Sequence, residues 1–207
     1  MTSFYDRHIL PRLVNMACGS AMASEERRKV VPLAEGVVVE VGIGSGLNLP
    51  FYDPDKVKHV IGVDPADEMH ALGRDRFDQA VVSVERISAP GEALPLEAAC
   101  ADTALLTFTG CTIPGIGEAL GELRRVLKPS GRLLFLEHGR SSDANIARWQ
   151  DRWNPVWKKL AGGCNINRDM AALIRDSGFE IEQLETYYTQ PFPRIATFHY
   201  RGSARPG

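Results

Sequence analysis

Short runs of β-branched and other apolar residues alternate along the chain with longer stretches whose apolar residues recur at helical spacing. This alternation predicts an α/β fold with a mostly parallel sheet, because strand–helix–strand units build such sheets. We expect strands at residues 37–41, 59–63, 81–87, 102–109, 132–137, 179–186 and 195–200. We expect helices at residues 67–78, 117–127, 144–160 and 167–177, with broken helical segments over residues 4–30.

Composition narrows the class of protein without identifying it. The chain has 207 residues, a formal net charge of −2 and 44% hydrophobic residues, which fits one globular domain. Because no basic excess is present, we expect no nucleic-acid partner. The sequence shows neither a signal-peptide pattern nor an apolar run long enough for a membrane span. We therefore expect a cytoplasmic protein without stable membrane insertion.

The four cysteines are far apart in the sequence, and none belongs to a CxxC pair. Such spacing favours neither a disulfide framework nor a zinc site, so we expect no metal. They are Cys18, Cys100, Cys111 and Cys164.

A glycine-rich loop follows the first predicted strand, in the segment EVGIGSGLNLPFY. Gly42, Gly44 and Gly46 allow positive φ and close approach of a ligand to the backbone, and a helix is expected to follow. A dinucleotide fingerprint would place its third glycine at Leu47. The observed spacing, with Glu40 two residues before the first glycine, suits S-adenosylmethionine better. A tight turn that binds no ligand is the alternative.

An acidic residue ends the second predicted strand. Asp64 lies about 20 residues beyond the glycine loop, where a carboxylate can accept hydrogen bonds from both ribose hydroxyls. A role as a turn residue is the alternative for Asp64 considered alone. The carboxylate would repel a 2′-phosphate, which argues against a dinucleotide-dependent reductase that uses NADP.

With these motifs in place, the chain resembles the class I S-adenosylmethionine-dependent methyltransferases over residues 35–200. The segments GEALPLEAACADTALLTFT and ELRRVLKPSGRLLFLEHG look like those of the branch that methylates small molecules. The short pieces CTIP, LEHG and GGCN are similar to the methyltransferase-like 7 family, the animal alkyl-thiol methyltransferases. The resemblance implies a Rossmann-like domain with a seven-stranded sheet and helices on both faces.

The resemblance also implies domain limits and cofactor contacts. Residues 1–34 would form a helical lid, residues 35–201 the methyltransferase domain, and residues 202–207 a flexible tail. Glu40 and the loop glycines would surround the methionine portion of the cofactor, and Asp64 would bind the ribose. The full set of cofactor-binding residues expected is Tyr5, Glu40, Gly42, Gly44, Gly46, Asn48, Asp64, Pro65, Met69, Gly91, Glu92 and Thr107.

The expected reaction is methyl transfer from S-adenosylmethionine to a small-molecule acceptor, releasing S-adenosylhomocysteine. The resemblance implies a thiol acceptor, with O-, C- or N-methylation of a phenol, quinol or lipid headgroup as the alternative. A cofactor-binding module without catalysis, or a reductase, is the alternative of another class. We expect His138 to act as a base or to orient the acceptor, with a hydrogen-bonded structural histidine as the alternative. Glu137 would orient His138 or serve as a helix-facing cap. Cys111 and Cys164 are expected to be packed rather than nucleophilic.

Three tryptophans recur at every fourth residue in the predicted helix 144–160. Trp149, Trp153 and Trp157 would share one face of this helix. Packing against the sheet is one interpretation of this row. An apolar lid for a hydrophobic acceptor, or a transient contact with a membrane surface, are the other two.

Overall fold

The computed structural model describes residues 9–189 and 193–207, and the chain forms one seven-stranded sheet with the order β3-β2-β1-β4-β5-β7-β6. Strands β1 to β5 pair in parallel, whereas β7 runs antiparallel to both β5 and β6. The predicted α/β class and the mostly parallel sheet are therefore confirmed. The strands are β1 Gly36–Val41, β2 Val57–Val63, β3 Val84–Ile87, β4 Ala101–Thr107, β5 Leu127–His138, β6 Phe179–Tyr188 and β7 Phe198–Pro206.

Helices cover both faces of the sheet because neighbouring residues of the central strands are apolar on both sides. Val38 and Leu105 pack in one hydrophobic cluster, while the adjacent Val39 and Leu106 pack in the cluster on the other face. Such continuous apolar strands are typical of a parallel sheet buried on both sides. The helices are α1 Leu10–Cys18, α2 Ala21–Val30, α3 Asp67–Leu72, α4 Arg74–Asp78, α5 Ile116–Val126, α6 Ala144–Leu160 and α7 Met170–Asp176.

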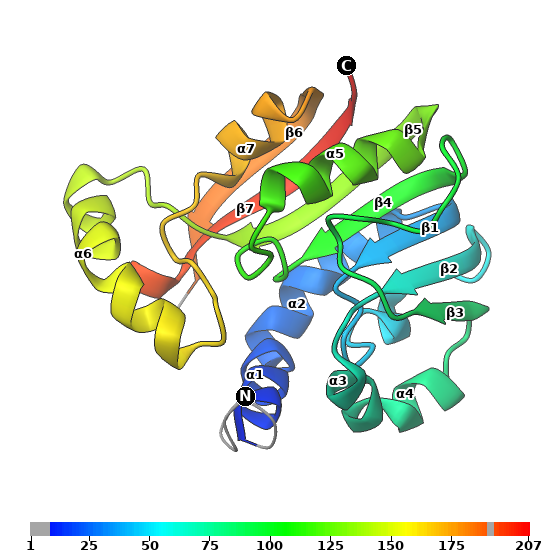
Figure 1. Ribbon diagram of the computed structural model, residues 1–207, viewed down its shortest axis with the longest axis horizontal. Helices are drawn as coiled ribbons and strands as arrows, with labels where there is room; N and C mark the ends of the chain where they lie inside the picture. Colours follow the sequence, from blue (N-terminus) through cyan, green and yellow to red (C-terminus); the bar gives the residue numbers. More distant parts are fainter. Residues whose placement is uncertain (1–8, 190–192) are drawn as a thin grey trace.

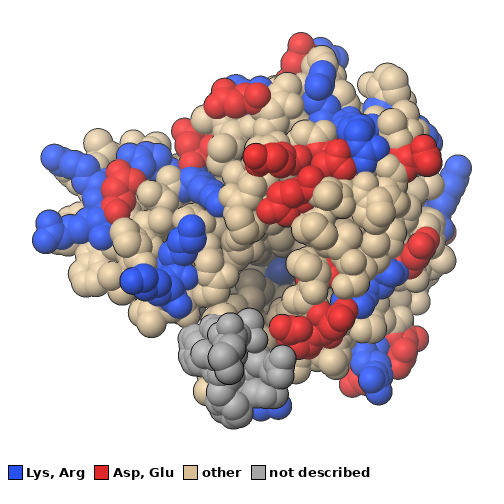
Figure 2. All heavy atoms as spheres, in the orientation of Figure 1, with Lys and Arg blue, Asp and Glu red and all other residues tan. Residues whose placement is uncertain are grey.

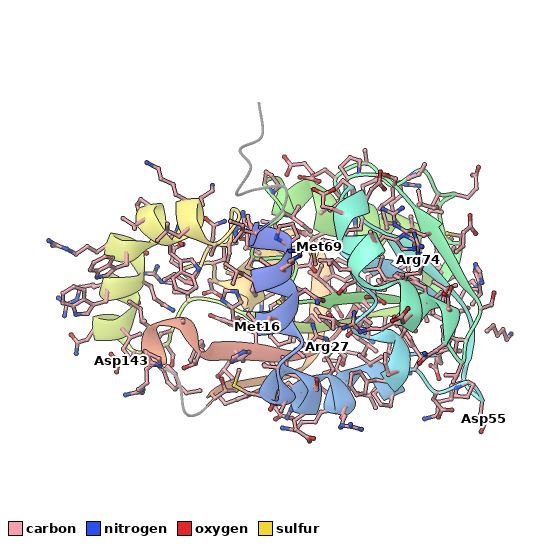
Figure 3. All side chains as sticks on the ribbon, turned by 90° about the horizontal axis from the view of Figure 1, so that it is seen from below. Met16, Arg27, Asp55, Met69, Arg74 and Asp143 are labelled. Atoms are coloured by element: carbon pink, nitrogen blue, oxygen red, sulfur yellow. The ribbon has the colours of Figure 1, made fainter. Side chains whose placement is uncertain are left out.

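The carboxyl ends of the central strands face the N-terminal helices. In Figures 1 and 3, α1 crosses this edge of the sheet between α6 on one side and α3 on the other. Arg201 on β7 and Tyr187 on β6 both bind Glu26, which ties α2 to the far part of the sheet. The fold therefore places three helical elements around one end of the strands.

None of the helices in the described ranges has the length and hydropathy required to cross a bilayer.

The expectation of a flexible tail at residues 202–207 is wrong. These residues form the second half of β7, where Ala204 pairs with Leu133 of β5 and Ile181 of β6. Ala204 is fully buried, and the Gly207 amide donates a hydrogen bond to the carbonyl of Gly178. The glycine, arginine and proline residues of this tail predict a disordered end, but pairing with β5 and β6 provides hydrogen-bond partners for its backbone.

Two predicted helices also differ from those found in the structure. The helix expected after the glycine loop is a single 3-10 turn, Leu49–Phe51, because Pro54 cannot donate a backbone hydrogen bond and Tyr52 is already extended. The predicted helix 67–78 is divided into α3 and α4 at Gly73. A Cβ at Gly73 would lie 2.1 Å from the Ser45 carbonyl oxygen, so the close approach of the glycine loop requires glycine there.

Candidate active site

A cavity of about 450 Å³ opens at the carboxyl ends of β1, β2 and β4, which is where ligands bind in open α/β sheets. Figure 2 shows the molecular surface hollowed between the part formed by α6 and the main body. The ends of the strands and the loops after them supply most of the lining, and α1, α2 and the turn after α6 supply the rest. The lining residues used below are Leu10, Val14, Cys18, Arg27, Glu40, Gly42, Gly44, Asn48, Asp64, Pro65, Met69, Gly91, Glu92, Thr107, Phe108, Thr109, Thr112, Ala161 and Gly162.

The glycine loop adopts the conformation that its sequence predicts. Gly42, Gly44 and Gly46 all have positive φ, at 77°, 50° and 71°. A Cβ at Gly42 would lie 2.1 Å from the side chain of Thr109, so only glycine lets the loops after β1 and β4 meet. Gly42 and Gly44 line the cavity, whereas Gly46 lies outside its lining and packs against Leu49.

Glu40 is the centre of a buried polar network at the floor of the cavity. Its carboxylate accepts hydrogen bonds from Asn48 Nδ2 at 2.9 Å and from the Tyr52 hydroxyl at 2.6 Å. Asn48 Nδ2 also donates to Thr107 Oγ1, and Asn48 Oδ1 accepts from Arg27 Nε, both at 2.9 Å. Burial raises the pKa of Glu40, and the hydrogen bonds from Tyr52 and Asn48 oppose that rise.

Two backbone hydrogen bonds hold the Asp64 carboxylate at the cavity. Its Oδ2 accepts from the Gly44 amide at 2.9 Å and its Oδ1 from the Ala66 amide at 2.8 Å. These bonds fix the carboxylate and leave lone pairs on both oxygens for a ligand. Burial raises the pKa of Asp64, and the two backbone hydrogen bonds counteract it.

Other predicted cofactor residues meet around the same cavity. Pro65 and Met69 come from the start of α3, and Gly91 and Glu92 come from the loop after β3. The Glu92 carboxylate accepts a hydrogen bond from the Gly115 amide at 3.1 Å, which joins this loop to the start of α5. Tyr5 lies outside the described residues.

His138 and Glu137 lie behind the cavity rather than in its lining. Glu137 is fully buried, and its Oε1 accepts from the amides of Thr109 at 2.8 Å and Gly110 at 2.9 Å. Burial raises the pKa of Glu137 to about 7. Its hydrogen-bond partners are thus the loop after β4, and no hydrogen bond joins it to His138 in the described ranges. The side chain of Glu137 supports a cavity wall.

His138 contacts a cysteine instead. Its Nε2 lies 3.3 Å from Cys164 Sγ, and Cys111 lies beside them. The neighbouring Cys111 thiol and His138 lower the pKa of Cys164 to about 4, and the proximity of Cys164 raises the pKa of Cys111. Both cysteines are buried, as expected, in a small cluster with Ile166. The spacing of these residues along the chain did not reveal that they meet.

Sequence reasoning also missed Arg27. This arginine comes from α2, is 3% exposed and lines the cavity. Its guanidinium donates to the Cys18 carbonyl at 2.5 Å and lies over the ring of Phe108 at 4.9 Å. Nothing in the local sequence distinguishes Arg27 from the neighbouring Arg28, which is exposed. Only the packing of α2 against the glycine loop separates their roles.

The three tryptophans of α6 do not pack against the sheet. Trp149, Trp153 and Trp157 are 55%, 50% and 38% exposed, so the core interpretation is wrong. The helix continues through Pro155 as far as Leu160. Trp157 Nε1 donates to Cys164 Sγ at 3.3 Å, which links one end of the row to the cysteine pair.

Comparison with known proteins agrees with this geometry. A family model described as a methyltransferase domain matches residues 39–135. The thiol S-methyltransferase TMT1B of Rattus norvegicus is 31% identical over 154 residues, which is 73% of this chain and 63% of that protein. The ubiquinone/menaquinone biosynthesis C-methyltransferase UbiE of Brucella anthropi is 30% identical over 142 residues, covering 59% of this chain and 54% of the relative. The chain thus spans less than two thirds of these relatives.

A solved structure shows the same fold. An S-adenosylmethionine-dependent methyltransferase from Thermotoga maritima superposes with a TM-score of 0.66 over 97% of this chain and 99% of its own, at 24% identity. Fold, cavity and family match together define a class I methyltransferase, and S-adenosylmethionine is the cofactor of that class. Within the class, this chain is similar to the thiol S-methyltransferases TMT1B of Rattus norvegicus and Homo sapiens, at 31% and 30% identity.

Proposed function

We propose that this chain transfers the methyl group of S-adenosylmethionine to the sulfur of a small, largely apolar thiol. The proposal rests on the division of the cavity lining into a part with buried carboxylates and a part with apolar side chains. Strand β1 and the loop after β2 supply the buried carboxylates of Glu40 and Asp64, whereas α1 and the loop after β4 supply apolar side chains such as Val14 and Phe108. Similarity to the thiol S-methyltransferases supports this choice of acceptor.

The carboxylates suit a cationic cofactor. Glu40 and the loop glycines would surround the methionine portion, and Asp64 would accept from the ribose hydroxyls. Pro65, Met69, Gly91 and Glu92 would hold the adenine. We add Arg27 to this set, since its buried guanidinium lines the same cavity and would attract the cofactor's carboxylate.

The reaction needs positioning more than acid–base chemistry. S-adenosylmethionine supplies both the methyl group and the leaving group. The protein has to hold the acceptor sulfur, the methyl carbon and the cofactor sulfur in line and exclude water. A thiol reacts as its thiolate, so the site must also favour loss of the thiol proton. The role of His138 as a base for this step stays a prediction.

An apolar acceptor would enter between α1 and α6. Leu10 and Gly162 meet at the cavity, and α6, which carries the exposed tryptophans, ends directly before the lining residues Ala161 and Gly162. Arg148, Arg152, Lys158 and Lys159 lie on the same helix. This combination of tryptophan and basic residues is compatible with transient contact with a membrane surface, from which a lipophilic thiol could be taken up.

A quinol is the second candidate acceptor, favoured by the similarity to UbiE. A turnover assay separates the candidates. The protein and S-adenosylmethionine are incubated with an alkyl thiol, hydrogen sulfide, a quinol, an amine lipid or no acceptor, and S-adenosylhomocysteine is quantified. We expect release that depends on a thiol. Release only with the quinol or the lipid would contradict the proposed acceptor. Binding of the cofactor without turnover on any acceptor would favour a non-catalytic module.

A variant pair tests the cofactor site in a binding assay with S-adenosylhomocysteine. Asp64→Asn should weaken binding of S-adenosylhomocysteine strongly, because an amide offers one acceptor oxygen where the carboxylate offers two. Asp55→Asn is the matched control, since Asp55 is exposed and lies at the far edge of the molecule (Figure 3). Equal affinity in the two variants would contradict the assignment of Asp64.

A further inference from the structure

Two thiols and one imidazole from three separate segments meet beside the cavity. Cys111 follows β4, His138 ends β5 and Cys164 follows α6. Their ligand atoms, the two Sγ atoms and His138 Nε2, all lie within 4.8 Å of one another. Both cysteines are buried and His138 is half-buried. This is the only such group of three among the described residues.

The surrounding chain holds this group in place. Asn165 donates from its backbone amide and from Nδ2 to the Cys111 carbonyl, both at 2.9 Å. Asn154 on α6 in turn donates to Asn165 Oδ1 at 3.2 Å and accepts from the Ile166 amide at 2.9 Å. The two loops that carry the cysteines are therefore joined by direct hydrogen bonds, which is the preorganisation that a metal site requires.

Two cysteines and a histidine form a recognised donor set for zinc. Zinc binds sulfur at about 2.3 Å and imidazole nitrogen at about 2.0–2.1 Å in tetrahedral geometry, and three protein ligands leave one open position. In tetrahedral geometry these bond lengths place sulfur and nitrogen ligand atoms about 3.5–3.6 Å apart and two sulfur atoms about 3.8 Å apart. His138 Nε2 and Cys164 Sγ are 3.3 Å apart and all three ligand atoms lie within 4.8 Å of one another, so shifts of about 1 Å or less would bring them to this arrangement.

We propose that Cys111, His138 and Cys164 bind one zinc ion, whose open fourth position takes the acceptor thiol. Thr112, next to Cys111, and Gly162, two residues before Cys164, line the cavity, so the three ligand side chains lie directly behind the cavity lining. The part of this inference that concerns the acceptor rests on the proposed thiol methylation. The zinc site itself rests on the geometry of the three side chains.

The chemistry balances without any redox change. Zinc binds the thiol sulfur, and the thiol proton leaves to solvent, because coordination by zinc strongly favours the thiolate. A lone pair of that sulfur then forms the new carbon–sulfur bond with the methyl group. The bond from the methyl carbon to the cofactor sulfonium breaks in the same step, releasing S-adenosylhomocysteine. The product thioether carries no charge and leaves the zinc ion.

Metal content tests the site without reference to turnover. The full chain is incubated with zinc chloride, passed over a desalting column and analysed by elemental mass spectrometry. We expect about one zinc per chain in the wild type and in Cys100→Ser, and a large loss in Cys111→Ser and Cys164→Ser. Cys100 is a control because it lies outside the group. Equal zinc content in all four proteins would overturn the proposal, as would a disulfide between Cys111 and Cys164 in the freshly purified protein.

Cobalt substitution gives a second measurement that does not depend on how well a variant folds. Wild-type protein loaded with cobalt(II) should show sulfur-to-metal charge-transfer absorption, and an alkyl thiol should change that spectrum. A cobalt spectrum without thiolate bands would overturn the zinc site. A thiolate spectrum that an alkyl thiol leaves unchanged would overturn the open fourth position. Zinc bound without thiol turnover would contradict the proposed function alone, whereas thiol turnover by zinc-free protein would contradict this inference alone.

Discussion

Arg27 of α2 donates a buried hydrogen bond of 2.9 Å from Nε to Oδ1 of Asn48, which follows the glycine loop. Asn48 in turn binds Glu40 and Thr107, so one chain of hydrogen bonds runs from the N-terminal helices to β1 and β4. The N-terminal segment is thereby joined to the cofactor cavity through polar contacts. Burial lowers the pKa of Arg27, and the nearby Glu40 opposes this effect.

This relationship makes Arg27 a test of the cofactor site. Arg27→Lys should reduce the affinity for S-adenosylhomocysteine about tenfold or more, because a hydrogen bond to a charged group contributes about 1.5–3 kcal/mol. Isothermal titration calorimetry measures the change. Arg28→Lys on the same helix is the matched control, since its guanidinium is exposed and contacts Glu25 and the Phe51 ring. A similar affinity in both variants would show that Arg27 supports the fold but not the cofactor.

Glu26 predicts a pH dependence of stability. The Glu26 carboxylate accepts hydrogen bonds from Lys29 and Tyr187 and forms an ion pair with Arg201. Burial raises the pKa of Glu26, but these three partners outweigh burial and lower the pKa below its ordinary value. Its contribution is therefore present above the unfolded pKa of about 4.3 and is lost as pH falls through the lower folded value. Glu26→Gln should lower the free energy of unfolding at pH 7 by about 0.5–1 kcal/mol after screening by solvent.

Denaturant titrations at several pH values would measure that difference. The gap between Glu26→Gln and the wild type should close as the pH falls below about 4, where the unfolded and then the folded glutamate become protonated. Glu25→Gln is the control, because Glu25 forms only an exposed pair with Arg28. A gap that stays constant with pH would mean that the ion pairs of Glu26 add nothing to the junction of α2 with β6 and β7.

The exposed tryptophans of α6 predict selectivity rather than stability. Trp153→Ala should change the free energy of unfolding by less than about 0.5 kcal/mol, because the side chain lies half in solvent. It should lower kcat/KM for a long-chain thiol about fivefold, since an apolar contact of this size contributes about 1 kcal/mol. Hydrogen sulfide makes no such contact and should react as before. Trp149→Ala, farther from the cavity, should lower kcat/KM for the long-chain thiol less than Trp153→Ala does. An equal loss of kcat/KM for the long-chain thiol and hydrogen sulfide in Trp153→Ala would exclude this role of α6.

The C-terminal strand predicts intolerance to truncation. Removing residues 202–207 would delete the half of β7, including buried Ala204, that joins β5 to β6. We expect the truncated chain to lose cooperative unfolding in a thermal melt. Arg205→Ala removes only exposed ion pairs with Glu180 and Glu182 and should cost less than about 1 kcal/mol. A truncated chain that melts like the wild type would contradict the structure of this edge.

Features that depend on local chemistry could be predicted from the sequence. The central strands are apolar on both faces. Gly42 stands where the loop requires positive φ, and Asp64 is a carboxylate at the end of the second strand. Their places in the fold follow from strand order alone, because parallel strands end at one edge of the sheet. The existence and location of the cavity were therefore within reach of sequence reasoning.

Features that depend on packing between distant segments could not be predicted from the sequence. Arg27 becomes a cavity residue only because α2 packs over the glycine loop. Cys111, His138 and Cys164 belong to three segments, and no spacing rule connects them. The tail at residues 202–207 has a polar composition, yet it gains a place in the sheet from partners on both sides. In each case the decisive term is a tertiary contact that local propensity does not encode.

Transfer of an isotope-labelled methyl group tests the central claim most directly. The protein is given S-adenosylmethionine with a deuterated methyl group, together with an alkyl thiol and a quinol in one vessel, and the products are identified by mass. We predict that the label appears in the thioether, in proportion to the S-adenosylhomocysteine formed, and that Asp64→Asn reduces both. Label found in the methylated quinol, with none in the thioether, would contradict the assignment of this chain as a thiol methyltransferase.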